Sequence, residues 1–438
     1  MAIYTKEQAR KILEKALSFS TADACEITLD GSNSGNIRYA RNTVSTSGQR
    51  SNQTLVVQSN FGLRSGISTI DEFDDASLEK VVKRSEELAK LSPENPEFMA
   101  PLGPQKYDVS NTFNEETANI TPEFRTKVAE SSIKPAGPKD VTAAGFFNDS
   151  ASFNALMNSN GLFAYNKSTN LEFTVTMRTN DGTGSGWVTR DFNDASKFDA
   201  TEASNVAISK AILSKEAKAI EPGKYTVILE PAASIGLLTR LFYSVDARRA
   251  DEGRSFMSKE GGGTKIGEKI IDERINVYSD PLHPEVPSAT FNGQGEPLKK
   301  MKWIENGVVK NLAYDRFWAK EKGVEPIPYP SNVIMEGGDA SLEELIKSTK
   351  KGILVTRLWY IRGVDPQTLL FTGLTRDGTF YIENGKIKHP VKNFRFNESP
   401  IIMLNNLETL GKQVRIDGFL IPYMKIREFT FTSLSDAV

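Results

Sequence analysis

The sequence contains one turn motif twice, WIENGVVK at residues 303–310 and YIENGKIK at residues 381–388. In each copy an Asn-Gly pair stands between residues that favour β-strands. A two-residue hairpin turn needs positive φ at both central positions, which Asn and Gly adopt at the lowest cost. We therefore predict two antiparallel hairpins, each turning at its Asn-Gly pair. The second half of the chain is accordingly expected to be rich in short strands.

The best domain boundary lies upstream of these hairpins, at Pro222-Gly223, because proline and glycine interrupt regular structure there. Residues 225–229, directly after it, form a strand-like run. This run begins a section that is richer in short strands. We predict an α+β fold of two domains. The N-terminal α+β domain is expected over residues 1–220 and the β-rich C-terminal domain over residues 221–438.

The first domain alternates predicted helices with antiparallel-looking strands. Helices are expected to start near Thr5, Ser77 and Thr121, which suit N-caps, and another is expected over residues 195–213. A proline-rich connection is expected over residues 92–122. The strand-like runs are residues 24–30, 36–41, 53–58, 63–70, 141–147, 161–165 and 172–178, with residues 31–35 as a loop.

The composition excludes several classes of protein. The 438 residues include 54 Lys+Arg and 56 Asp+Glu, so the formal net charge of -2 offers no broad positive field to nucleic acid. A single cysteine rules out a disulfide framework. Cys25 alternates with polar residues, which favours a reduced core cysteine over a reactive thiol. Without a secretion signal or an apolar run of about 18 residues, we expect a cytoplasmic protein with no membrane and no direct nucleic-acid contact.

The chain has few side chains that could bind zinc or activate a nucleophile. Its two histidines, His283 and His389, lie far apart in sequence, so a zincin helix with paired imidazoles cannot form. No Gly-x-Ser-x-Gly elbow accompanies them. The acidic run at residues 71–75 suits a solvated helix start better than a divalent-cation site. We therefore expect no catalytic residue, no metal and no cofactor in this chain.

Two glycine clusters, at residues 182–186 and 261–263, match neither a P-loop nor a dinucleotide-binding fingerprint. Both are expected to be flexible loops. Glycine lets another backbone approach closely, so the second cluster could border a peptide groove. Its candidate peptide-binding residues are Gly261, Gly262 and Gly263.

Aromatic and basic residues mingle in residues 356–362, where period-2 spacing sets Leu358 and Tyr360 on the face opposite Arg357. Two interpretations stay open. The segment is an ordinary strand, or its arginine lies beside the hydroxyl-rich turn of residues 372–379 and holds a carboxylate or a peptide carbonyl. The candidate peptide-binding residues in this part of the chain are Arg357, Tyr360, Thr375 and Arg376.

Residues 356–360 and 377–387 resemble the C-terminal signature of the TldD/PmbA family, also called modulators of DNA gyrase, and so do residues 304–316. The resemblance implies a two-domain fold that assembles as a homodimer or heterodimer around an internal chamber. It also implies two kinds of subunit. TldD-type subunits are metallopeptidases with a His-Glu-x-x-x-His helix and a later Cys ligand, and they trim unfolded peptides. PmbA-type (TldE) subunits lack these ligands and pair with the active ones.

The helix predicted after Pro231 resembles the family's metal-binding helix in position, and its counterpart of the motif reads TRLFYS. Thr239, Arg240 and Ser244 would then stand at a vestigial metal position, where Arg240 places a positive charge. The resemblance favours a metal-free PmbA/TldE-like subunit that handles unfolded peptides beside a TldD-type metallopeptidase subunit. The alternatives are a peptide-binding or regulatory homodimer of the gyrase-modulator type, and a metal-independent hydrolase with an unrecognised site.

Overall fold

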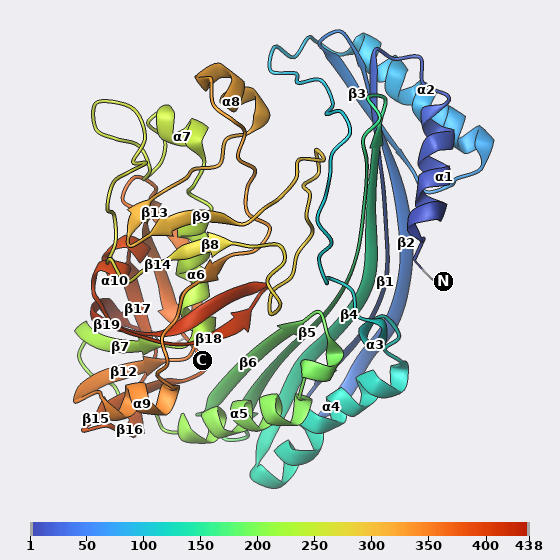
Figure 1. Cartoon of the computed structure of the whole chain (residues 1–438). Helices are drawn as coiled ribbons and strands as arrows, with labels where there is room; N and C mark the ends of the chain where they lie inside the picture. The colour runs from blue at the N-terminus through green and yellow to red at the C-terminus, as the bar shows by residue number, and fades with distance from the viewer. Residues whose placement is uncertain (1–2, 436–438) are drawn as a thin grey trace.

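The computed structural model describes residues 3–435 and contains two sheets, one in each half of the chain. The N-terminal sheet is long and curved and lies along one side of the C-terminal body (Figure 1). Its strand order is β3-β2-β1-β4-β5-β6, with all neighbours antiparallel. The strands are β1 (Ala24–Ala40), β2 (Thr43–Phe61), β3 (Arg64–Ile70), β4 (Val141–Asn158), β5 (Phe163–Thr179) and β6 (Ser185–Phe192).

Helices pack against this sheet in two groups. The first group is α1 (Lys6–Leu17) and α2 (Asp75–Leu91); the second is α4 (Pro122–Ala136) and α5 (Ala200–Leu213), with the short α3 (Glu115–Ala118) beside them. The first group buries Leu13 and Val82 against β1 and β2, where Cys25 is also fully buried. The second buries Val128 and Ile208 against β4 and β5. Apolar burial thus fastens each helix pair to its own end of the strands.

The helix starts agree with the sequence at two of four places. Thr5 forms the predicted capping box, and Thr121 caps the helix that begins at Pro122. Helix α2 is capped by Asp74 instead of Ser77, because the Asp74 carboxylate accepts the Ser77 backbone N–H. Helix α5 begins at Ala200, because residues 195–197 form a separate 3₁₀ turn before its cap.

The strands are much longer than predicted, and the expected loop at residues 31–35 is wrong. Those residues continue strand β1, with β2 on one side and β4 on the other. A Cβ on Gly31 would lie 2.3 Å from the Phe153 ring, and one on Gly35 would lie 1.9 Å from the Arg125 guanidinium. Glycine therefore makes room for tertiary partners here, which a local pattern cannot distinguish from a turn.

The C-terminal sheet has thirteen strands, nine of which follow the order β10-β9-β8-β11-β19-β7-β12-β15-β16. The remaining four, β13, β14, β17 and β18, pair off this path. The strands are β7 (Gly223–Leu229), β8 (Val277–Ser279), β9 (Met301–Glu305), β10 (Val308–Val309), β11 (Ile334–Met335), β12 (Lys351–Val355), β13 (Leu358–Asp365), β14 (Leu370–Thr375), β15 (Thr379–Glu383), β16 (Lys386–Pro390), β17 (Phe394–Glu398), β18 (Leu407–Ile416) and β19 (Phe419–Leu434). Its helices are α6 (Pro231–Phe242), α7 (Ala247–Asp251), α8 (Arg316–Lys322), α9 (Leu342–Lys347) and α10 (Pro400–Asn405).

Both predicted hairpins are confirmed. The β9–β10 turn has φ of 51° at Asn306 and 73° at Gly307, and the β15–β16 turn has 51° at Asn384 and 74° at Gly385. These are the left-handed values that the Asn-Gly pairs predict. The whole chain is a mixed α+β structure, as expected from the sequence. No helix in the described part of the chain combines the length and apolar composition that a membrane crossing requires.

Candidate peptide-binding site

Helix α6 carries Thr239 and Arg240 of the predicted vestigial metal position, and Ser244 lies in the turn that follows the helix. It begins at Pro231, directly after strand β7, and its apolar side buries Leu237, Leu238 and Leu241 in the C-terminal core. The helix also packs closely on strand β13. A Cβ on Gly236 would lie 2.6 Å from Cδ1 of Ile361, so only glycine permits this approach.

The polar side chains of this helix segment bind backbone carbonyls. The Thr239 hydroxyl donates to the Ile235 carbonyl at 2.9 Å, and the Ser244 hydroxyl donates to the Leu241 carbonyl at 2.7 Å. All of these partners belong to α6 or to the turn that follows it. The two hydroxyls are therefore satisfied locally and do not converge on a common point.

Arg240 joins α6 to strand β13. Its guanidinium donates to the Gly236 carbonyl at 2.5 Å and to the Ile361 carbonyl at 2.9 Å, and it lies 5.3 Å from the centre of the Phe371 ring. Burial lowers the pKa of Arg240. The positive charge lies between two carbonyl oxygens, so Arg240 fixes the strand to the helix.

The residues of α6 do not fit a zinc ion. Residues 231–244 contain no His, Cys, Asp or Glu, the side chains that ligate zinc in proteins. Among residues 3–435, no group of three or more such side chains is placed to hold a metal ion. The two histidines lie elsewhere. His283 accepts the Glu285 backbone N–H in a loop, and His389 stacks on Tyr381 at 5.2 Å.

Strand β13 does not alternate as predicted. Leu358 is 7% exposed, but Tyr360, which was expected on the same face, is 51% exposed. The reason is a left-handed backbone at Tyr360 (φ 55°), accompanied by a shift in the pairing with β14 between Trp359 and Arg362. This irregularity turns neighbouring aromatic side chains outward together.

Four side chains around this irregularity form a surface of stacked aromatic rings and guanidinium groups. The rings of Trp359 and Tyr360 lie 5.4 Å apart. Arg362 covers Tyr360 at 4.2 Å, and Arg376 covers Trp359 at 4.2 Å. We call these four residues the Trp359 surface. The rings offer apolar area to a bound chain, and the guanidinium groups that stack on them offer hydrogen-bond donors.

Arg357 lies directly before strand β13 and links the two sheets. It forms an ion pair with Asp377 at 2.5 Å and lies 4.0 Å from the Trp187 ring centre on β6. Asp377 is 3% exposed and accepts the Ser185 hydroxyl at 2.6 Å. Burial lowers the pKa of Arg357, and the Asp377 charge opposes that shift. Both sheets are thereby fastened at one buried carboxylate.

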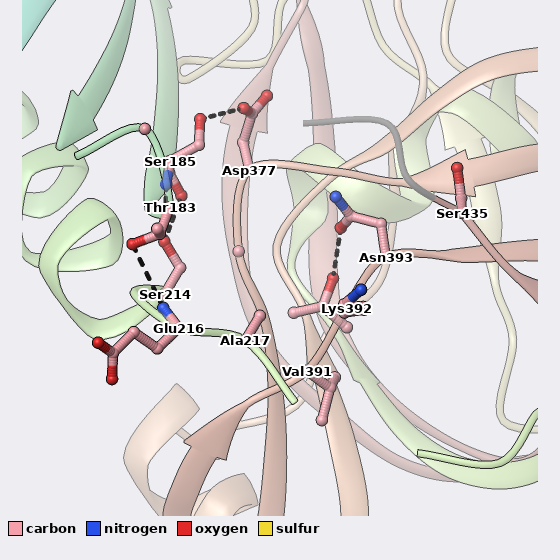
Figure 2. Close-up of a pocket in the computed structure, with 13 residues that line it drawn as sticks. Thr183, Ser185, Ser214, Glu216, Ala217, Asp377, Val391, Lys392, Asn393 and Ser435 are labelled. Carbon is pink, nitrogen blue, oxygen red and sulfur yellow. Dashed lines mark hydrogen bonds between the residues drawn. The ribbon is translucent and has the colours of Figure 1, made fainter. Parts of the chain in front are cut away.

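A cavity of about 310 Å³ adjoins this link (Figure 2). Figure 2 shows Ser185 and Asp377 meeting at one edge, with Ser214 and Glu216 on the side of α5 and Asn393 opposite. The lining residues are Gly182, Thr183, Ser185, Ser214, Glu216, Ala217, Asp377, Gly378, Thr379, Val391, Lys392, Asn393 and Ser435. The wall combines both halves of the chain, so its shape depends on how the two sheets meet.

The glycine cluster at residues 182–186 is packed more tightly than a flexible loop. Gly186 lies inside β6, and the cluster adjoins α5. A Cβ on Gly184 or Gly186 would lie 2.2 Å from the carbonyl oxygen of Ala211 or Ala207, respectively. These two glycines therefore let α5 rest on the strand that carries Ser185. Sequence reasoning noticed the cluster but missed Ser185, Trp187 and Asp377.

The predicted peptide-binding residues fall into two separate places. Arg357, Tyr360, Thr375 and Arg376 lie on the β13–β14 hairpin and its flanks. Thr375 is fully buried, where its hydroxyl accepts the Phe394 N–H at 3.0 Å. Gly261, Gly262 and Gly263 belong to a turn that closes on Lys259 through two backbone hydrogen bonds. All three have positive φ and open space where a Cβ would be.

Comparison with known proteins shows which family this fold belongs to. Residues 222–433 match the family model described as the PmbA/TldA metallopeptidase C-terminal domain. Residues 115–218 match the model of the central domain of the same metallopeptidases. The chain belongs to the PmbA/TldD family.

Three relatives illustrate the likeness. A metalloprotease of Methanothermobacter thermautotrophicus is 25% identical over 300 residues, which cover 63% of each chain. A zinc metalloprotease TldD homolog of Saccharolobus solfataricus is 28% identical over 43% of this chain and 44% of the relative. The matches therefore span less than two thirds of these two relatives. The crystal structure of TldE from Thermococcus kodakarensis has the same fold, with a TM-score of 0.87, 21% identity and coverage of 97% and 99%.

Proposed function

We propose that this chain is a metal-free, TldE/PmbA-type subunit that holds unfolded peptides for a metallopeptidase subunit of the same family. The observation that carries the proposal is the state of helix α6. The helix contains no side chain that ligates zinc. Backbone carbonyls accept the hydrogen bonds of Thr239, Arg240 and Ser244. The family is related to metallopeptidases, so the hydrolytic centre is assigned to the partner subunit.

The Trp359 surface is the proposed place of peptide contact. Trp359 and Tyr360 are 37% and 51% exposed, and stacked rings of this kind bind apolar side chains. The guanidinium of Arg362 lies on the same side of the strand and could donate to peptide carbonyls. An unfolded peptide exposes such carbonyls along its length, whereas a folded protein pairs most of them internally. The proposed specificity is therefore for extended chains. We propose that the protein binds such chains in the cytoplasm.

The experiment separates binding from hydrolysis. The purified chain is mixed with a fluorescein-labelled unstructured peptide, and fluorescence anisotropy measures binding while mass spectrometry measures cleavage. We expect saturable binding with no cleavage, and cleavage only when a subunit bearing the His-Glu-x-x-x-His helix is added. Cleavage by the chain alone that a chelator abolishes would contradict the proposal.

A regulatory homodimer is the second candidate. It is favoured by one observation, the long unpaired edge of strand β2. A solved structure from Thermotoga maritima with the same fold is named a putative modulator of DNA gyrase. Any such role would act through protein contact, because the net charge of -2 does not favour binding to DNA phosphates. A stable homodimer that binds no unfolded peptide would favour this candidate.

A further inference from the structure

Strands β13, β14 and β17 form a layer with one face in the core and one face outside. Strand β14 pairs with β13 on one side and with β17 on the other, antiparallel in both cases. Phe371 of β14 and Phe396 of β17 are buried in the C-terminal core. Side chains alternate along a strand, so the even-numbered positions of β14 and the odd-numbered positions of β17 point to the opposite face.

The strand register extends the Trp359 surface across this outer face. Directly opposite residues of antiparallel strands share a face. Trp359 pairs with Leu374, and Leu374 pairs on its other side with Arg395, which is exposed. Arg362 pairs with β14 in the adjacent row. Since neighbouring strands lie about 4.8 Å apart, the backbone of Arg395 lies about 10 Å from that of Trp359. We call the Trp359 surface together with Leu374 and Arg395 the arginine face.

The positive charges of Arg362 and Arg395 are not neutralised by the described part of the chain. Neither side chain forms an ion pair with another residue between positions 3 and 435. The carboxylates of the same strands are bound elsewhere. Asp365 accepts two hydrogen bonds from the turn that follows it, and Glu398 is 2% exposed on the core side. The arginine face therefore combines exposed rings with cations that have no carboxylate partner among these residues.

We propose that the arginine face binds peptide segments in which the side chain of an aspartate or glutamate lies close to an apolar side chain. This inference rests on the proposed function and names its substrate class. A guanidinium group donates two parallel hydrogen bonds to a carboxylate, and an exposed ring packs against an apolar side chain. Residues two apart in an extended peptide point to the same side and lie about 6.8 Å apart, so one short segment supplies both groups.

The arrangement of the two arginines favours side-chain carboxylates over a chain end. Arg362 and Arg395 lie on strands that β14 separates, so an extended peptide that crosses the face passes both. Acidic side chains recur along such a peptide, whereas its terminal carboxylate occurs once. A lysine at the same place is repelled by the two guanidinium groups. The arginine face thus selects peptides by charge as well as by apolar contact.

Matched peptides test this preference by fluorescence anisotropy. Each is an unstructured Gly-Ser peptide with the same dye, an amidated C-terminus and a central Leu-x-Phe, where x is Asp, Asn or Lys. We expect the Asp peptide to bind about fivefold more tightly than the Asn peptide, and the Lys peptide to bind most weakly. Added salt should shrink the difference between Asp and Asn, because salt screens exposed ion pairs.

The outcomes separate this inference from the proposed function. Equal, saturable binding of the three peptides would overturn the charge preference and leave peptide binding in place. Binding that requires a free C-terminus would overturn the assignment to side-chain carboxylates. Absence of binding by every peptide would overturn both the preference and the proposed function.

Substitutions locate the preference on the molecule. Arg362→Gln with Arg395→Gln should bind the Asp and Asn peptides equally, and retained binding of the Asn peptide shows that this variant is folded. Arg362→Lys with Arg395→Lys keeps the charges and should retain part of the preference. Arg50→Gln, at an exposed arginine of β2 that forms no ion pair within residues 3–435, is the matched control and should keep the fivefold difference. A preference that survives the double glutamine variant, or that Arg50→Gln abolishes, would overturn the proposal.

Discussion

Residues 43–54 of strand β2 and strand β13 each have one side that no described strand pairs, yet the two segments differ in length and in their side chains. The β2 segment is long and polar, with a single charge at Arg50 and a β-bulge at Ser45. Strand β13 is irregular at Tyr360, carries exposed rings, and has its Ile361 carbonyl bound by Arg240. A long polar edge suits recognition through the backbone, whereas a short strand with exposed rings suits recognition through side chains. The comparison predicts that a substitution in one of the two segments leaves binding by the other segment unchanged.

The largest effect is expected where β13 is fastened to the N-terminal sheet. Asp377→Asn removes the charge that pairs with Arg357, while Asn still tolerates the left-handed backbone at this position (φ 54°). Breaking a buried ion pair costs about 3 kcal/mol of unfolding free energy. Urea denaturation should show a loss of that order. Asp365→Asn, at the half-buried last position of β13, forms no ion pair with another described residue and is the control, which should cost less than about 1 kcal/mol.

A smaller, pH-dependent effect is expected at Glu398, whose strand β17 supports β14. Glu398 is 2% exposed, and burial raises the pKa of its carboxyl to about 6. A raised folded-state pKa adds stability that is fully present below about pH 4.5 and is lost as pH rises through about 6, about 2 kcal/mol in all. Glu398→Gln should lack this change. The difference in unfolding free energy between wild type and variant should shift by that amount from pH 4.5 to pH 7, and a constant difference would contradict the prediction.

We expect Trp359→Ala to have the smallest effect on folding stability and a clear effect on peptide binding. Trp359→Ala removes a ring that is already 37% exposed, so the fold loses little. Peptide affinity should fall about tenfold, because aromatic contacts of this kind contribute about 1 to 2 kcal/mol. Phe146→Ala, which removes a ring of similar exposure (39%) on β4, is the matched control. Equal losses in the two variants, measured by anisotropy, would argue against the Trp359 surface.

Local chemistry explains which parts of the fold were predictable. Asn306 and Asn384 were located correctly because a type I′ turn is decided by two adjacent residues. Gly31 and Gly35 were misread as a loop because their partners, Phe153 and Arg125, lie more than 80 residues away in sequence. The strands appeared short for the same reason. Their middle sections are rich in Ser, Asn and Gly, and the neighbouring strands hold them extended.

The candidate site was predictable in part. The sequence marked the β13–β14 region through its mixture of aromatic and basic residues, and the structure places four of the predicted residues there. The roles differ among them. Thr375 is buried and braces Phe394, and Arg357 binds Asp377 across the two sheets. Asp377 and Ser185 are 192 positions apart, so their contact depends on the tertiary arrangement and leaves no local signal.

The Arg240 link has a consequence for how this helix could change over evolutionary time. A single substitution of Arg240 by glutamate would set a carboxylate against the carbonyl oxygens of Gly236 and Ile361, which Arg240 binds. The intermediate would lose the tie to β13 and gain repulsion before any metal ligand set was complete. Thr239, Arg240 and Ser244 would therefore have to change together for this segment to acquire a set of zinc ligands.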